Sequence, residues 1–348
     1  MIPSNVKNIL ILKWGALGDL IMATSTIRAV RENFPDAKIM MFTNLLMREL
    51  LPEGLFVDEY VFLKKSGRHV DESFFKQLLC IRKLRKRKFD IAIDLKWKSE
   101  RASVLTYLSG AKIRVGYWEK FIHRCYTHTL KHPIGGYHEV HRNLDVIKLI
   151  GLKIKDENPV VYVSDTDKKF ADDFFVHNSL NKENVVCIHP GASKPNRAWL
   201  PERFCEIAKR LTEKYNVMIL LTWGANEKEL VNGIAEQLGG NAYVSPRTES
   251  IGQLAALIQN CRMFISVCTG PMNVANAVNI PIVALLGSTD PLDWSPYGKI
   301  HRTIKSPLVL EHYSDEDEEK ALKAITVENV WSVVDAKWNE LKEVMNDE

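Results

Sequence analysis

The amino-acid sequence predicts an α/β protein with two doubly wound domains, each built on a mostly parallel sheet. Short β-rich runs alternate with helical stretches, and this alternation begins again near residue 185. Parallel strands need long crossover connections, usually helices, so the alternation places helices on both faces of each sheet. The chain, with 348 residues, is also long enough to form two hydrophobic cores.

The first domain is expected over residues 1–178. Its predicted strands are residues 8–13, 38–43, 57–63, 89–94 and 113–115, and its predicted helices are residues 19–33, 71–87 and 99–109. Residues 116–137 show no clear period and are predicted to form a long loop. The pattern weakens between residues 151 and 184, which indicates the connection between the domains.

The second domain is expected over residues 179–326. Its predicted strands are residues 185–189, 217–223, 242–245, 263–267 and 282–287, and its predicted helices are residues 201–215, 227–238, 250–260 and 271–278. Pro201 suits the first turn of a helix, where a missing N–H is tolerated. Residues 327–348 are predicted to form a last amphipathic helix that could pack back on the first domain.

The composition excludes several classes of protein. With 46% hydrophobic and 26% charged residues, the chain is typical of a soluble globular protein. It has no apolar run near the roughly 18 residues that cross a bilayer and no signal-peptide core, so we expect a cytoplasmic protein. A net charge of +4 is too small to indicate a nucleic-acid partner, and six scattered cysteines indicate neither a disulfide framework nor a zinc site.

Charge is unevenly distributed along the chain. Residues 82–88 are a dense basic run, and residues 315–319 are all acidic. The basic run is typical of a solvated helix face, and the alternative is a surface attracted to anionic lipid or to an anionic acceptor.

Ligands of open parallel sheets bind outside the carboxyl ends of the strands, so the loops after the strands are the candidate sites. After the first strand, Gly15 and Gly18 precede Asp19 at a predicted helix start. Asp19 is either a helix cap or, where the glycines turn the backbone tightly, a carboxylate that acts as a general base.

The first loop of the second domain suits a diphosphate. Ser193, Lys194 and Arg197 offer a hydroxyl and two cations in a turn of small residues after strand 185–189, although a polar surface loop is the alternative. Glu227, after the next strand, suits the two hydroxyls of a ribose or caps its own helix.

A second candidate for phosphate binding is the helix start at Thr269 and Gly270, which follows strand 263–267. The first turn of a helix has free N–H groups and the positive end of the helix dipole, and both attract anions.

Two patterns resemble metal motifs and are better explained otherwise. His138-Glu139-Val140-His141 is one residue short of the metalloprotease motif H-E-x-x-H. Asp165-Thr166-Asp167 looks like a D-x-D motif that chelates a divalent ion, but it precedes a helix, so capping is predicted. We infer neither a metal nor a cofactor.

Taken together, the loops resemble glycosyltransferase family 9, the ADP-heptose:lipopolysaccharide heptosyltransferases. The matching motifs follow the family's order along most of the chain. They are Ile9-Leu10-Ile11-Leu12-Lys13 with Gly18-Asp19, Asp94-Leu95-Lys96-Trp97-Lys98-Ser99, Arg114-Val115-Gly116-Tyr117, His189-Pro190-Gly191-Ala192-Ser193, Trp199-x-Pro201-Glu202-Arg203-Phe204, Ser250-Ile251-x-x-Leu254-Ala255, Thr269-Gly270-Pro271-Met272 and Gly287-Ser288-Thr289-Asp290-Pro291.

The resemblance implies a GT-B architecture, in which two Rossmann-like domains face a central cleft. The first domain would bind the acceptor and the second a nucleotide-sugar donor. The implied reaction is an inverting, metal-independent transfer of a sugar, most simply heptose, from an ADP-sugar to a lipopolysaccharide core or a related glycan. A lipid-linked or oligosaccharide acceptor of this kind would place the enzyme at the inner face of the cytoplasmic membrane.

The resemblance also implies roles for single residues. Asp19 matches the family's base, Glu227 the acid that holds the ribose, and Arg197 stands where a lysine is usual. The donor-binding residues implied are Ser193, Lys194, Arg197, Glu227, Thr248, Thr269, Gly270, Pro271, Met272 and Asn273. On the acceptor side, Lys98, Arg101 and Arg114 are predicted to follow strands and to receive acidic sugars or phosphates.

One motif departs from the family. The usual Asp-Thr-Gly-Pro-x-His has Cys268 in place of the Asp and Asn273 in place of the His. Asn273 keeps a hydrogen-bond donor but carries no charge, which predicts weaker phosphate stabilisation. Two alternatives follow: a non-catalytic relative that binds a nucleotide sugar or a glycan, and a nucleotide-sugar epimerase of the same architecture that converts donor without acceptor.

Overall fold

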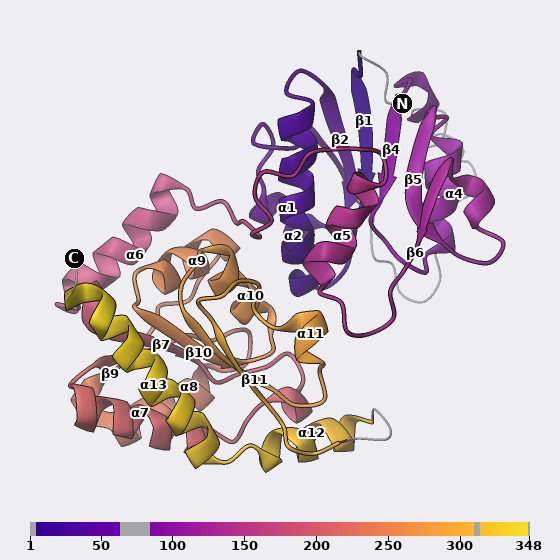
Figure 1. Cartoon of the computed structure of the whole chain (residues 1–348). Coiled ribbons are helices and arrows are strands. Elements are labelled where there is room, and N and C mark those ends of the chain that lie inside the picture. The colour runs from indigo at the N-terminus through magenta and orange to yellow at the C-terminus, as the bar shows by residue number, and fades with distance from the viewer. Residues whose placement is uncertain (1–4, 63–83, 310–313, 347–348) are drawn as a thin grey trace. The chain divides into compact units, whose positions relative to one another are not determined.

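The computed structural model describes residues 5–62, 84–309 and 314–346. The chain divides into two compact units, Met1–Tyr162 and Val163–Glu348. Each unit contains one six-stranded sheet in which all neighbouring strands are parallel, with helices packed on the sheet (Figure 1). The predicted α/β class with two parallel sheets is confirmed.

The first sheet has the strand order β3-β2-β1-β4-β5-β6. Its strands are β1 Asn8–Leu12, β2 Lys38–Thr43, β3 Glu59–Phe62, β4 Ile91–Asp94, β5 Ile113–Trp118 and β6 His128–Lys131. The helices of this unit are α1 Leu17–Asn33, α2 Leu45–Leu50, α4 Glu100–Leu108 and α5 Glu139–Lys148, with a short 3₁₀ turn at His123–Cys125.

The apolar sequence of the central strand β1 agrees with a sheet that is covered on both faces. Its apolar residues are all buried, and a near-continuous apolar run is typical of a strand covered on both faces. Leu10 and Leu12 pack with Ala102 of α4 in one core cluster. On the opposite face, α1 and α5 lie side by side (Figure 1).

The second sheet has the order β12-β11-β10-β7-β8-β9, which repeats the order of the first sheet when its strands are counted from β7. Its strands are β7 Val185–His189, β8 Met218–Leu221, β9 Ala242–Val244, β10 Met263–Val267, β11 Ile282–Leu286 and β12 Arg302–Lys305. The helices are α6 Asp165–His177, α7 Pro201–Tyr215, α8 Lys228–Leu238, α9 Ile251–Gln259, α10 Gly270–Ala277, α11 Pro291–Trp294, α12 Asp315–Ala324 and α13 Val327–Asn346, with short 3₁₀ turns at Lys182–Asn184, Pro195–Arg197 and Gly239–Asn241.

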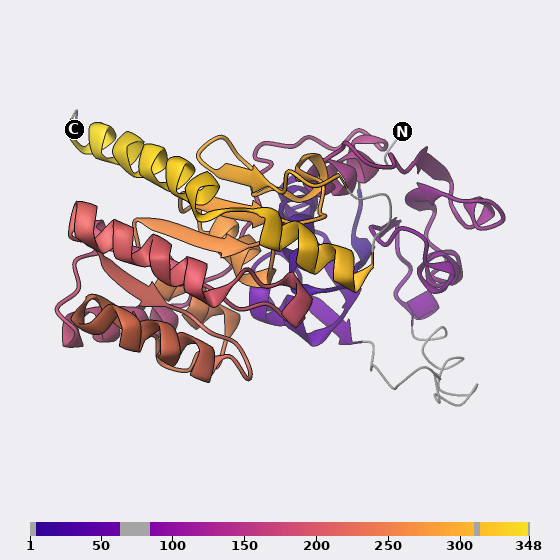
Figure 2. The ribbon, with the colours of Figure 1, turned by 90° about the horizontal axis from the view of Figure 1, so that it is seen from below.

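One face of the second sheet is covered by α7, α8 and α13. Phe204 of α7, Ile234 of α8 and Trp338 of α13 are buried in the same core cluster as Ile188 and Ile265 of the sheet. Figure 2 shows α7 between α8 and α13 along this face.

Several predicted elements differ from the structure. The loop predicted at residues 116–137 is wrong, because β5 continues to Trp118 and β6 pairs with it in parallel. Helix 71–87 lies largely outside the described residues, which include only its end from residue 84. The sequence pattern also missed α2, α5, α11, β12 and α12, whereas the helix expected at Asp165-Thr166-Asp167 is present as α6.

The boundary between the units lies at residues 162 and 163, earlier than the 178 and 179 expected. The reason is α6, which packs on α9 of the second unit. Ser250 donates a hydrogen bond to Asp167 at 3.0 Å, and Asn260 donates one to Asp172 at 2.9 Å. The segment expected to link the domains is therefore a structural helix of the second unit.

The last helix, α13, uses its apolar face within the second unit. Val330, Val334 and Trp338 are buried in the core cluster that includes α7 and β11. The expected return of this helix to the first domain stays a prediction. In the part of the chain that the structure describes, no helix is long and apolar enough to cross a membrane.

Candidate functional site

The strand order identifies one candidate site in each unit. In the first sheet the order reverses between β1 and β4, and in the second between β7 and β10. Ligands of doubly wound sheets bind outside the carboxyl ends of the strands at such a switch point. The loops that follow these four strands are therefore the candidate sites.

Asp19 lies at the switch point of the first unit, in the first turn of α1. The Ala16 N–H donates to Asp19 Oδ2 at 3.0 Å, so the expected capping role is present. A Cβ at Gly15 would lie 2.6 Å from Asp19 Oδ2, which explains why a glycine stands there. Within the described residues, no hydrogen bond to the second carboxylate oxygen is found, and the residue is partly exposed.

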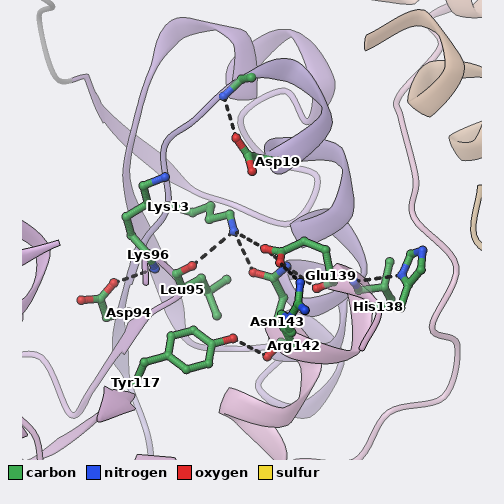
Figure 3. Close-up of polar contacts among 12 residues, drawn as sticks. Lys13, Asp19, Asp94, Leu95, Lys96, Tyr117, His138, Glu139, Arg142 and Asn143 are labelled. Atoms are coloured by element: carbon green, nitrogen blue, oxygen red, sulfur yellow. Dashed lines mark hydrogen bonds and ion pairs between the residues drawn. The ribbon is translucent and has the colours of Figure 1, made fainter. Parts of the chain in front are cut away.

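Beneath this loop is a buried polar cluster around Lys13, which is 3% exposed (Figure 3). Its ammonium group donates to the Leu95 carbonyl at 3.2 Å, to Glu139 Oε1 at 3.2 Å and to Asn143 Oδ1 at 3.0 Å. Burial opposes ionisation of Glu139, but the charges of Lys13 and Arg142 hold its pKa below the usual value. Lys13 has three N–H donors and uses all three, so it joins β1 to α5 rather than binding substrate.

Asp94, at the end of β4, is a second buried group at the same edge. It accepts hydrogen bonds from the Lys96 N–H at 2.8 Å and from the Tyr126 hydroxyl at 2.7 Å. Burial nevertheless raises the pKa of Asp94 to about 7. The Tyr126 ring lies against Gly116, where a Cβ would be 2.6 Å from a ring carbon. Glycine in the Arg-Val-Gly-Tyr motif therefore lets this tyrosine reach Asp94.

The three cations predicted for the acceptor are placed differently. Lys98 is exposed on the loop after β4, with its ammonium group 4.2 Å from the centre of the Trp97 ring, and Arg101 is exposed in α4. Arg114 lies inside β5 rather than after a strand. Its guanidinium donates to the carbonyl oxygens of Ala111 and Cys125, both at 2.7 Å. Ala111 precedes β5, so the Arg114 side chain points toward the amino ends of the strands and away from the candidate site at their carboxyl ends.

In the second unit, Glu227 is held at the carboxyl ends of β7 and β8. It directly precedes α8, but its carboxylate does not cap that helix. Instead, Glu227 Oε2 accepts a hydrogen bond from the Gly224 N–H at 2.6 Å. A Cβ at Gly191 would overlap this carboxylate, so the loop after β7 needs glycine at that position. Of the two roles predicted for Glu227, the capping of its own helix by the side chain is therefore excluded.

His189 lies beside Glu227 and is buried. Its Nε2 is 3.6 Å from Glu227 Oε2, and its Nδ1 is 3.2 Å from the Thr222 hydroxyl. Burial lowers the pKa of His189 to about 4, so the imidazole is neutral near pH 7. The two side chains therefore do not form an ion pair near pH 7.

The loop after β7 presents Ser193, Lys194 and Arg197 as exposed side chains. The Lys194 ammonium lies 3.3 Å from Asp315 Oδ1 of α12, in a pair that is largely exposed to solvent. No hydrogen bond or ion pair of the Arg197 side chain is found among the described residues. Exposed ion pairs contribute little stability, so an anionic ligand would displace Asp315 from Lys194 easily.

The loop after β10 leads into α10, whose first turn contains Gly270 and Pro271. The Thr269 hydroxyl donates to the Val267 carbonyl at 3.3 Å and does not cap the helix. The Thr269 side chain therefore leaves the first N–H groups of α10 uncapped, and the binding of an anion there stays a prediction.

Three further donor residues differ in their exposure. Met272 is fully buried and Asn273 is 4% exposed. The Asn273 amide donates to the Thr269 carbonyl at 2.9 Å, so one of its two N–H donors is used within the helix. Thr248 is half-buried in the loop after β9.

A family model described as glycosyltransferase family 9 (heptosyltransferase) matches residues 78–325. The chain belongs to this family. It is therefore a glycosyltransferase, and the sequence resemblance is confirmed.

Known members of family 9 are similar over most of the chain. Lipopolysaccharide heptosyltransferase 3 of Escherichia coli (strain K12) is 26% identical over 302 residues, which cover 80% of this chain and 82% of that protein. The family 9 glycosyltransferase of Veillonella parvula has a TM-score of 0.80 at 22% identity and covers 96% of this chain and 97% of its own. Heptosyltransferase WaaC of E. coli with ADP-2-deoxy-2-fluoro heptose has a TM-score of 0.70 at 18% identity, covering 94% and 99%. The predicted GT-B fold of two Rossmann-like units is confirmed.

Sequence reasoning missed part of the site. Glu139 and Asn143 were not recognised, although Val140, Leu144 and Ile147 have the spacing of a helix face. The capping role predicted for Asp165-Thr166-Asp167 is confirmed, since the Asp167 N–H donates to Ser164 and the Asp167 carboxylate accepts from the Ser164 N–H. Among the described residues, no group of three or more His, Cys, Asp or Glu side chains is arranged to hold a metal.

Proposed function

We propose that this family 9 glycosyltransferase transfers heptose from ADP-heptose to a lipopolysaccharide core or a related glycan, with inversion at the anomeric carbon and without a metal ion. The relative from E. coli is named a lipopolysaccharide heptosyltransferase, and the WaaC structure holds an ADP-heptose analogue. Both similarities support the donor and the acceptor class.

The observation that carries the donor half is the free first turn of α10 at the β7 and β10 switch point. Its N–H groups and the exposed Arg197 would hold the diphosphate, and Ser193 and Lys194 lie on the same loop as Arg197. The Glu227 carboxylate, oriented by the Gly224 N–H, would accept the two ribose hydroxyls.

The first unit would supply the base. Asp19 is fixed through Oδ2, and its other oxygen would take the proton of the acceptor hydroxyl. That hydroxyl oxygen then forms a bond to the anomeric carbon as the bond to the β-phosphate breaks, and the electron pair leaves with ADP. General-base catalysis of this kind contributes roughly 10²-fold to 10⁴-fold to rate.

The acceptor would be lipid-linked or an oligosaccharide. Lys98 and Arg101, both exposed near the carboxyl end of β4, would receive its acidic groups. We further propose that the protein works in the cytoplasm, peripheral to the inner face of the cytoplasmic membrane, where such an acceptor would be presented.

A direct test is product formation from a panel of nucleotide sugars, with and without a deheptosylated lipopolysaccharide acceptor. We expect transfer from ADP-heptose only when acceptor is present, an inverted anomeric configuration by NMR, and unchanged turnover in EDTA. Donor consumption without acceptor would support an epimerase instead. Binding of ADP with no turnover of any donor would support a non-catalytic relative.

A further inference from the structure

The helix α12 lies outside the second sheet (Figure 1). It contacts two of the loops that follow the strands of this sheet. At its start, Asp315 accepts hydrogen bonds from Asn196 at 3.1 Å and lies 3.3 Å from the Lys194 ammonium, so it is tied to the loop after β7. One turn on, the Ser288 hydroxyl donates to the Glu318 carboxylate, so the helix is also tied to the loop after β11. The acidic run at residues 315–319 therefore belongs to a helix that is docked on these loops.

Glu318 lies at a corner shared by the loops after β10 and β11. A Cβ at Gly287 would be 3.0 Å from Glu318 Oε1 and 2.9 Å from Leu322, so glycine at 287 makes room for this part of α12. The Cys268 N–H donates to the Leu285 carbonyl of β11 at 3.0 Å, so the residue before the α10 helix start lies close to the loop that contacts Glu318. Burial raises the pKa of the Cys268 thiol to about 11, the charge of Arg197 opposes this rise, and the charge of Glu318 adds to it. A carboxylate and a guanidinium therefore both act on the residue that precedes α10.

This pair of charges suits a ligand with two chemically different halves. The helix start and Arg197 attract a diphosphate, whereas a carboxylate at the same corner repels it. A carboxylate can only accept hydrogen bonds, and the hydroxyls of a sugar can donate them. An acidic group beside a diphosphate site is therefore favourable only where the ligand also brings hydroxyls.

We propose that Glu318 binds hydroxyl groups of the transferred sugar and so selects an intact nucleotide sugar over the free nucleotide. This inference rests on the proposed function, because it assumes that the diphosphate lies at the start of α10. The proposal places a contact to the donor sugar on α12, whereas the other donor contacts lie on loops that follow sheet strands.

Calorimetry on the full chain with ADP and with ADP-heptose tests this proposal. Glu318→Gln keeps the shape of the side chain and removes its charge. We expect it to weaken ADP-heptose binding roughly 10-fold to 100-fold, as for loss of hydrogen bonds to a charged group. ADP binding should be unchanged or tighter, because a like charge near the phosphates is removed. Glu316→Gln, on an exposed position of the same helix, should change neither affinity.

The two ligands separate a sugar contact from a structural role. Equal weakening of ADP and ADP-heptose by Glu318→Gln would overturn the proposal, because α12 would then only support the diphosphate loops. Unchanged affinity for both ligands would overturn it as well. A parent protein that binds ADP but not ADP-heptose would contradict both the inference and the proposed donor, and that outcome is visible before any variant is made.

Discussion

The ammonium nitrogen of Lys13 lies 3.2 Å from a carboxylate oxygen of Glu139, and this contact joins the end of β1 to the first turn of α5. The two side chains are only 4% and 13% exposed. Lys13 stands two residues before Gly15, so the ion pair anchors the loop that carries Asp19. The position of Asp19 thus depends on a contact between segments more than 100 residues apart.

Replacing Lys13 should destabilise the first unit. Lys13→Met leaves the buried Glu139 with Arg142, 3.5 Å away, as its remaining cation, and breaking a buried pair costs up to about 3–5 kcal/mol. Urea unfolding followed by circular dichroism should show a lower midpoint. Lys153→Met, at an exposed position, should change stability by less than about 0.5 kcal/mol. Equal midpoints for the parent and Lys13→Met would refute the structural role of the pair.

The buried Asp94 predicts a pH dependence. Its folded pKa is about 7 and its ordinary value is 3.8, so the folded state binds the proton more tightly. The associated stability is present below pH 4 and is lost as pH rises through 7, by up to about 4 kcal/mol. Unfolding of Asp94→Asn should lack this loss. If the stability difference between parent and variant is the same at pH 5 and pH 8, the raised pKa is wrong.

Gly191→Ala should weaken nucleotide binding and leave the fold intact. The three atoms nearest to the added Cβ are all in the Glu227 carboxyl group, at the far end of that side chain, so we expect the carboxylate to move and the ribose contact to be lost. We expect a weaker ADP affinity by calorimetry with a nearly unchanged melting temperature. Gly233→Ala in α8, where a Cβ meets nothing within 4 Å, is the matched control. Normal ADP affinity in Gly191→Ala would contradict the role of Glu227.

Arg197 should contribute charge to diphosphate binding. Arg197→Ala is expected to weaken ADP binding roughly 10-fold to 100-fold, and Arg197→Lys should recover part of the loss because it restores the charge without the planar guanidinium. Lys299→Ala, another exposed cation of the same unit, serves as control. An Arg197→Ala protein that binds ADP like its parent would remove this residue from the donor site.

The central strands and the loops after them could be predicted from sequence, for a physical reason. β7 and β10 are buried on both faces, so they appear as short apolar runs, and both were predicted with the observed ends. The glycines beside Asp19 and Glu227 mark positions where a carboxylate lies against the backbone. Apolar runs and glycine positions are properties of neighbouring residues, so they can be recognised directly in the sequence.

The parts that were missed depend on contacts between distant segments. α5 carries the polar residues Glu139 and Asn143, which are compensated in the fold by Lys13, because its ammonium group donates to both of them and to the Leu95 carbonyl. α12 has an acidic first turn that looks solvated in sequence, yet it contacts Asn196, 119 residues earlier. No local pattern predicts a partner at that separation.

The measurement that tests the account most directly is transfer from ADP-heptose to a lipopolysaccharide acceptor by the parent and by Asp19→Asn, with ADP affinity measured on the same preparations. Asparagine can still accept the hydrogen bond from Ala16 but cannot take a proton. The account predicts a kcat at least about 100-fold lower in Asp19→Asn with unchanged ADP affinity. Equal turnover by the two proteins would contradict the assignment of Asp19 as the base.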